Sequence, residues 1–370
     1  MADEKGEKAD ERRLIDVTPV EMLATSEVVK LVAEVAVLVD TIRCSRTVPT
    51  ASAATIGSMS RIPPRAGAFI AVIFWGISFV ATKAALREIS PITLIFLRFA
   101  IGAVLLFAIV RKLPPRDALP QLALMGFLGV FLHQMIQANA LTMTTAVHTG
   151  WLIGVTPIWS AVLSAIVFRE RFGFWKIVGL TGGFAGALLV ITRGDFHSSL
   201  LSLPSTRGDL LILLSGLNWS IYSVVGHPTI KRVGPRVATS GGMLLGLAML
   251  APFFVATRGW RELPQLTPIG WTSVLFLAVG CSALGYLFWY GALEHIEVSR
   301  VAALLYLEPL ITFGAAILML HEPVSGTAIA GGLIVLGSVA IAQYAPAAKQ
   351  TAEISANRDP SRIEIDMEES

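Results

Sequence analysis

The feature that most constrains this chain is a series of long apolar runs, separated by short polar breaks, that fills residues 66–344. Each run has roughly 20 residues, which lets a helix cross about 30 Å of hydrocarbon. Helices are required because lipid offers no hydrogen-bond partner to an open strand edge. The runs predict an all-α integral membrane protein with ten transmembrane helices, near residues 66–86, 92–110, 119–138, 146–167, 174–192, 208–227, 238–257, 270–290, 298–318 and 326–344.

The composition agrees with a lipid environment. Of the 370 residues, 54% are hydrophobic and 15% are charged, whereas soluble domains average about 25% charged residues. The net charge of +3 is too small to indicate a nucleic-acid partner. Cys44 and Cys281 cannot form a disulfide framework, and Cys281 is expected to be a buried thiol. We expect neither a metal site nor a cofactor.

The two ends of the chain differ from the apolar middle. Residues 1–65 are rich in mixed charges and then in Ser, Thr, Ala and Arg, and the apolar stretch 28–39 is too short to span a membrane. We expect a disordered extension there and a functional protein that starts at Met59 or tolerates truncation to it. The acidic tail, residues 347–370, is also expected to be disordered.

The distribution of loop cations predicts the orientation. With a cytoplasmic N-terminus, ten Lys and Arg residues lie in inner loops and five in outer loops. This distribution favours a protein of the cytoplasmic (inner) membrane with both ends on the cytoplasmic side. The inner residues are Arg111, Lys112, Arg116, Arg169, Arg171, Lys176, Lys231, Arg232, Arg236 and Arg300, and the outer residues are Arg87, Arg193, Arg207, Arg258 and Arg261.

An internal repeat divides the apolar region in two. Pairs align at offsets of 144 and 152 residues: Trp75 with Trp219, Pro91 with Pro235, Pro157 with Pro309, and Glu170 with Glu322. The halves are expected to be residues 66–192 and 208–346, joined by an outer linker, 193–207. Because five spans is an odd number, the second half would be inverted in the membrane, as in many transporters.

These segments resemble the drug/metabolite transporter superfamily in its EamA-like branch. The stretch 74–99 reads FWGISFVATKAALREISPITLIFLRF and resembles the family's opening, and residues 140–172 and 292–324 each carry its AL…P…E pattern. The resemblance implies two EamA repeats around a central cavity, and alternating access. The second half departs from the first at two cations, with His227 in place of Lys83 and Gly242 in place of Arg98.

Polar and aromatic side chains inside the spans are the candidate substrate contacts, because a polar group in hydrocarbon is costly. Lys83 is expected either to snorkel to the interface or to line an outer vestibule. Arg98 either pairs with a carboxylate or helix-end carbonyls, or binds a substrate carboxylate. His133 is expected to share a face with Gln137. The full set is Trp75, Phe79, Lys83, Arg98, His133, Gln137, His148, Trp151, Tyr286, Trp289 and Tyr306.

Glu308 is the most informative acidic residue, because it lies ten residues from either end of the predicted span 298–318, directly before Pro309. Its carboxyl can bind a substrate amine, accept a coupling proton or bridge to Arg98. Glu170 and Glu322 are expected to cap the next helix or meet a loop cation, with gating contacts as the alternative.

The pattern predicts a secondary transporter that exports a small polar metabolite, an amino acid or a similar carboxylate-bearing solute. A cluster of Lys83, Arg98, His133 and His148 facing one cavity would favour such a solute. No GxxxxGK[ST] motif is present, so a coupled proton or an exchanged metabolite would drive transport. The alternative is a membrane-embedded enzyme acting on lipid or prenyl phosphates, although the ten acidic residues within 66–346 include no DxxD-like pair.

Overall fold

The computed structural model describes residues 63–168, 173–195, 205–293, 295–296, 301 and 304–344. All of them belong to one unit of the chain, Gly57–Ser370. Every regular element among them is helical, and they contain no strand. The predicted all-helical class is therefore confirmed.

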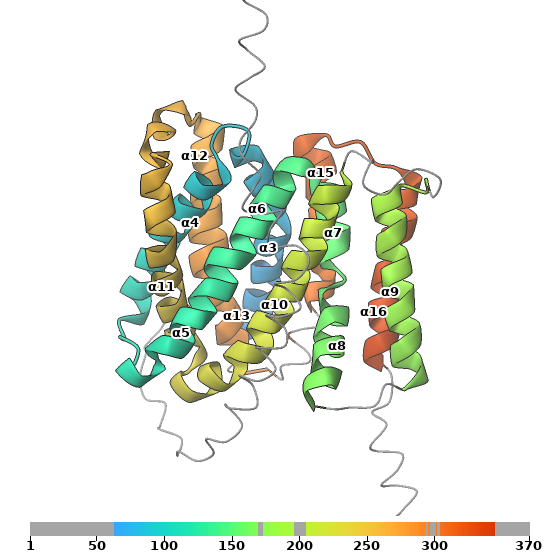
Figure 1. Cartoon of the computed structure of the whole chain (residues 1–370), viewed down its shortest axis with the longest axis horizontal. Coiled ribbons are helices and arrows are strands. Elements are labelled where there is room, and N and C mark those ends of the chain that lie inside the picture. The colour runs from blue at the N-terminus through green and yellow to red at the C-terminus, as the bar shows by residue number, and fades with distance from the viewer. Residues whose placement is uncertain are drawn as a thin grey trace, which may run out of the picture. The chain divides into compact units, whose positions relative to one another are not determined.

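The helices run along roughly one common direction (Figure 1). In the first half they are α3 (Pro64–Ala85), α4 (Pro91–Val110), α5 (Leu119–Gly126), the π-helical η4 (Phe127–Leu132), α6 (His133–Met143), α7 (Ala146–Ile153), α8 (Thr156–Phe168) and α9 (Phe174–Thr192). In the second half they are α10 (Thr206–Val233), α11 (Pro235–Ala256), α12 (Pro268–Leu275), the π-helical η8 (Phe276–Leu284), α13 (Gly285–Leu293), the 3-10 helix η9 (Leu304–Leu307), α15 (Glu308–Leu320) and α16 (Gly326–Tyr344).

Eight segments of the described chain are long and apolar enough to cross a membrane, and two shorter apolar helices, Leu304–Leu320 and Gly326–Ala342, follow them. The eight are Pro64–Ala85, Pro91–Val110, Arg116–Met143, Ala146–Leu163, Phe174–Thr192, Thr206–Val233, Pro235–Ala256 and Pro268–Ala292. The chain is thus a multi-pass membrane protein.

Four predicted spans are not continuous α-helices. The spans 119–138 and 270–290 include the π-helical η4 and η8, and the other two are interrupted near a proline. The span 146–167 contains a turn after α7, and α8 begins at Thr156, one residue before Pro157. The span 298–318 contains the 3-10 helix η9, and α15 begins at Glu308. Glu308 therefore does not lie in mid-helix, as the sequence predicted. The reason is proline, which lacks an N–H and is favoured in the first turn of a helix.

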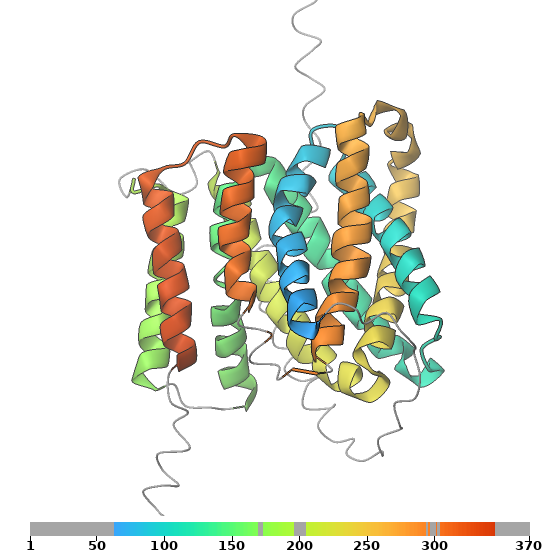
Figure 2. The same ribbon diagram turned by 180° about the vertical axis from the view of Figure 1, so that it is seen from behind.

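The helix contacts made by one half correspond to those made by the other half. Helix α3 packs against α13 and α15, and α10 packs correspondingly against α6 and against α7 and α8. Likewise α4 contacts η8, and α11 contacts α5 and η4. The equivalent helices α4 and α11 pair directly, as do α9 and α16, which lie side by side in both views (Figures 1 and 2). When the two halves are exchanged, each of these contacts corresponds to another of them or, for the pairs of equivalent helices, to itself.

Helices α9 and α16 are antiparallel and meet through small residues. A Cβ added to Gly179 would meet Ala342, whereas one added to Gly186 would meet Gly331, further toward the start of α16. Glycine at these positions lets the two backbones approach closely, which is how membrane helices gain dispersion contacts.

We expect Gly186→Ala to lower the free energy of unfolding by about 1–3 kcal/mol, the usual cost of overpacking. Its Cβ would lie 2.7 Å from the carbonyl oxygen of Gly331, a backbone atom that cannot turn aside. Gly337→Ala, in α16, is the control, because nothing lies within 4 Å of its Cβ position. Thermal unfolding of the purified variants measures both, and equal stability would contradict this packing.

Candidate functional site

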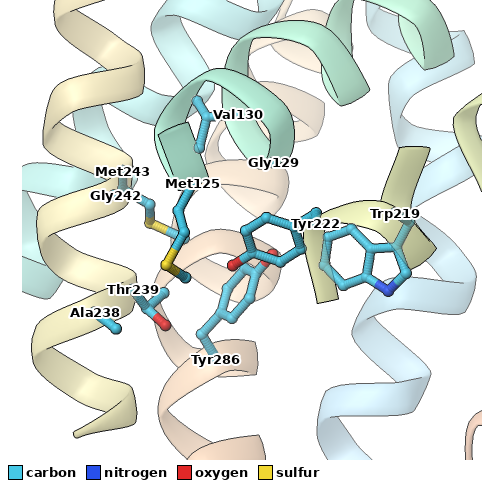
Figure 3. Close-up of a pocket in the computed structure, with 10 residues that line it drawn as sticks. All are labelled: Met125, Gly129, Val130, Trp219, Tyr222, Ala238, Thr239, Gly242, Met243 and Tyr286. Carbon is cyan, nitrogen blue, oxygen red and sulfur yellow. The ribbon is translucent and has the colours of Figure 1, made fainter. Parts of the chain in front are cut away.

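A pocket lies between α5, η4, α10, α11 and α13 (Figure 3). Aromatic rings and thioethers form most of its wall, and Thr239 adds a hydroxyl. Figure 3 shows Trp219 beside Tyr222, and the centroids of these two rings are 5.0 Å apart. The lining residues are Met125, Gly129, Val130, Trp219, Tyr222, Ala238, Thr239, Gly242, Met243 and Tyr286. The pocket therefore combines flat apolar surfaces with a few hydroxyl groups, and both halves contribute to it.

Trp75 of α3 joins this wall to a second group of aromatic rings. Its ring lies 5.5 Å from that of Tyr286 and 5.2 Å from that of Trp289. Its Nε1 donates a hydrogen bond to the carbonyl of Cys281, 3.2 Å away, within the π-helical η8. Gly285 permits the approach, because a Cβ there would lie 3.0 Å from the same nitrogen. Trp75, Tyr286 and Trp289 thus form one cluster.

Arg98 is buried beside this cluster without a carboxylate partner. Only 7% of the residue is exposed. Its Nε donates to Ser282 Oγ at 2.9 Å and its Nη1 to Gln134 Oε1 at 3.2 Å. Within the described part of the chain, no carboxylate lies within 4.0 Å of it. Two neutral acceptors leave the charge of a guanidinium uncompensated, and its fork of five donors is not exhausted.

Glu308 acts on two of the residues that Arg98 acts on. The carboxyl group of Glu308 and the guanidinium of Arg98 each interact electrostatically with Tyr286 and Cys281. The backbone carbonyl of Glu308 accepts from Thr312 Oγ1 at 2.9 Å, and the same hydroxyl contacts the carbonyl of Gly76 at 2.8 Å. These contacts fix the start of α15 against α3. The bridge to Arg98, one of the three alternatives for this residue, is not formed.

Lys83 turns into the protein at the far end of α3. Its Nζ donates to the carbonyls of Leu141 and Thr144 and lies 3.9 Å from Glu322 Oε1. These contacts point the ammonium group toward protein acceptors, and they leave the two alternatives for Lys83, snorkelling and an outer vestibule, as predictions. The last carbonyls of α6, which have no intrahelical donor, provide these polar partners inside the protein.

Glu322 caps α7 rather than the helix that follows it. Its two carboxylate oxygens accept from the backbone N–H groups of Ala146 and Val147 at 3.0 and 2.9 Å. A carboxylate is favoured there because the first N–H groups of a helix lack partners and carry partial positive charge. Glu170 lies outside the described residues.

His148 belongs to a buried network around Asp209, which is 0% exposed. The Nδ1 of His148 lies 3.1 Å from Asp209 Oδ2, and Ser205 Oγ donates to the same oxygen at 3.0 Å. The hydroxyl of Thr144 donates a hydrogen bond to Asp209 Oδ1. Asp209 thus has partners at the end of α6, in α7 and at the start of its own helix, α10.

The predicted single cluster of Lys83, Arg98, His133 and His148 is not formed. Lys83 and His148 belong to the Asp209 network, whereas Arg98 and His133 lie nearer the pocket. The Nδ1 of His133 is 3.1 Å from the carbonyl of Ser215, and its ring packs on Trp219 at 5.1 Å. Helical spacing placed these four residues on helix faces but could not say which faces meet.

The other predicted residues lie in the apolar core. Phe79 and Trp151 are buried in one cluster with Tyr306 packed against it. The ring of Trp151 lies 5.2 Å from that of Phe313. Gln137 is half-buried, and Gln134 is the glutamine that contacts Arg98. Phe79 and Trp151 therefore support the fold rather than the pocket.

The selection of residues from the sequence missed part of the site. Tyr222, Thr239, Met125 and Met243 line the pocket, and Asp209 is the centre of the buried network. Two signals were present. Tyr222 is a mid-span tyrosine like Tyr286, and Asp209 is an acidic residue at the start of an apolar run. The two methionines and Thr239 carry no such signal, because their types are common in any span.

Comparison with known proteins decides the family. The model of the EamA-like transporter family matches residues 66–192 and 206–343. The chain belongs to this family. The resemblance to the drug/metabolite transporter superfamily is thereby confirmed.

Named relatives of this EamA-like protein are transporters. An uncharacterized transporter of Archaeoglobus fulgidus is 33% identical over 274 residues, covering 72% of this chain and 94% of the relative. An uncharacterized transporter of Bacillus subtilis is 29% identical over 295 residues, covering 77% and 93%. A probable amino-acid metabolite efflux pump of Salmonella typhimurium is 25% identical over 304 residues, covering 78% and 97%.

A solved crystal structure has a similar fold. It matches with a TM-score of 0.53 over 75% of this chain and 96% of that chain, at 21% sequence identity. At that identity the likeness shows the fold alone.

We expect Arg98→Ala to reduce transport by roughly 10- to 100-fold, the effect of losing hydrogen bonds to a charged group. Arg98→Lys should retain more activity, because the charge survives although the planar fork does not. Arg111→Ala is the control, since it removes an exposed arginine at the end of the same helix. Equal, near-normal transport by both Arg98 variants would assign this residue to a dispensable structural role.

Proposed function

We propose that this EamA-like protein is a secondary transporter that exports a small carboxylate-bearing metabolite, such as an amino acid, by alternating access. It would lie in the cytoplasmic membrane with both termini inside. Its ten spans would form two inverted five-helix repeats, residues 66–192 and 208–346, joined by an outer linker, 193–207. The substrate would bind between the repeats, at the pocket and the adjoining Arg98.

The inverted arrangement is supported by the packing of equivalent helices. Helices α9 and α16 are antiparallel. Phe96 near the start of α4 stacks on Phe254 near the end of α11, with ring centroids 4.0 Å apart. Equivalent helices that run in opposite directions are what an inverted duplication produces.

One observation above the others supports the proposal that the substrate carries a carboxylate. Arg98 is buried beside Ser282 and Gln134 with no acidic partner among the described residues. A buried charge without a counter-ion is costly, and a substrate carboxylate would supply the missing charge. Export rather than uptake is favoured by the Salmonella relative, which is named as an efflux pump.

Glu308 is the candidate for coupling. It begins α15 at a break in the span and interacts electrostatically with Tyr286 and Cys281. A carboxyl there can exchange a proton when the break opens to one face and then to the other, or it can bind a substrate amine. Exchange of a second metabolite is the other source of energy.

Flux into sealed proteoliposomes tests both the function and the coupling. We expect wild-type protein to move a carboxylate-bearing solute such as an amino acid against its gradient when a pH gradient is imposed. Glu308→Gln retains shape and hydrogen bonding but cannot take up a proton, so it should still exchange solute and lose pH-driven accumulation.

Glu262→Gln is the matched control, because Glu262 accepts from the backbone N–H of Ser90 at the start of α4, away from the pocket. Unchanged pH-driven accumulation by Glu308→Gln would eliminate the coupling role. Absence of flux by wild-type protein across a panel of carboxylate solutes would contradict the proposed function.

A further inference from the structure

The Asp209 network joins elements of both halves at one end of the bundle. Thr144 is the link, because its carbonyl accepts from Lys83 of α3 and its hydroxyl donates to Asp209 of α10. Lys83 in turn lies 3.9 Å from Glu322, just beyond α15. The ends of α3, α6 and α15 and the start of α10 meet there, uppermost in Figure 1.

The pocket lies toward the other end of the same helices. Along α10, Asp209 precedes the pocket residue Tyr222 by 13 positions, about 20 Å at the rise of an α-helix. In the α5 to α6 span, the pocket residue Met125 precedes Thr144 by 19 positions, again on the far side from the network. The buried network therefore separates the pocket from one face of the bundle.

The charged groups that face this network come from every element around it. Asp209 of α10 faces His148 of α7 and interacts electrostatically with Lys83 of α3. Glu322 caps α7, and Arg87, in the turn after α3, acts on Lys83. On the α9 side, Arg193 contacts Ser205 at 3.3 Å. The acidic groups of this network thus belong to the second half, and the cations that face them belong to the first half or directly follow it.

We propose that this network is the gate that closes the bundle at its Thr144 end, with Asp209 as the residue on which closure depends. In the orientation proposed above, this face is the outer one. Separating α10 from α6 and α7 would leave the carboxylate of Asp209 without Thr144 and His148, two of its three partners. Closure is favoured because buried charge-assisted hydrogen bonds are strong and leaving one unmade is costly. The inference rests on the proposed alternating access, but it makes a claim about accessibility that needs no substrate.

The test uses a reporter cysteine in the pocket, Met243→Cys, in a Cys44→Ser and Cys281→Ala background. Membrane-impermeant thiol reagent is applied to either side of sealed, oriented vesicles. With the gate intact, we expect labelling from the cytoplasmic side to be faster. Asp209→Asn, which loses the charge and keeps the volume, should speed labelling from the outer side by roughly tenfold or more, as expected for a lost charge-assisted bond.

Asp117→Asn is the matched control, because Asp117 is exposed and pairs with exposed Arg232 at 3.2 Å, in the loop before α5. Thr144→Val is a second test, since it removes the hydroxyl that binds Asp209 and keeps the carbonyl that binds Lys83. Size-exclusion profiles and melting temperatures establish which variants are folded.

Unchanged outer labelling in folded Asp209→Asn or, should that variant not fold, in Thr144→Val would overturn the gate. Failure of both variants to fold would also overturn it, because the network would then be a folding core. Increased outer labelling together with no flux of any solute would keep the gate and contradict the transport function, so the two failures are distinguishable.

Discussion

The structure depends on one constraint, that a backbone in lipid has to satisfy its hydrogen bonds internally. Continuous α-helices do so at no further cost, and most of the described chain consists of them. The exceptions are the π-helical segments η4 and η8 and the helix breaks before Thr156 and Glu308. Such irregular backbone is tolerated in a membrane protein where other helices or a cavity surround it.

The irregular segments are also where the polar groups gather. The carbonyl of Cys281, within η8, accepts from Trp75, and Ser282 in the same segment accepts from Arg98. Glu308 begins the helix after the second break. The departures from regular helix thus bring a cation, a carboxyl and a set of aromatic rings to the boundary between the halves.

Polar groups at the Thr144 end are combined differently. There, the acidic residues Asp209 and Glu322 have Lys83, His148 or backbone N–H groups of the other half as partners. Arg98 has only neutral partners among the described residues. Charged groups that have partners can hold two halves of a protein together. A buried charge without a counter-ion is typical of a site that binds a charged ligand. The same residue types therefore take different roles according to their surroundings.

More of the fold than of the candidate site could be predicted from the sequence. Apolar runs located the spans within a few residues, because hydrocarbon thickness sets helix length. The breaks were missed because a proline in an apolar run is equally compatible with a kink. Helical spacing singled out Gln137 beside His133, but Gln134 meets Arg98, and only the packing of α4 on α6 and η8 decides that. Asp209 was missed because its partners are distant in the sequence.

The central claim is that the two halves are inverted around a shared site, and labelling of equivalent loops tests it most directly. Lys112 follows α4 and Arg258 follows the equivalent helix α11, and both are exposed. Each would be changed to cysteine in a Cys44→Ser and Cys281→Ala background and exposed to impermeant reagent on either side of sealed vesicles. Inverted halves predict labelling of the residue 112 cysteine only from the cytoplasmic side and of the residue 258 cysteine only from outside. Labelling of both from the same side would contradict the inversion.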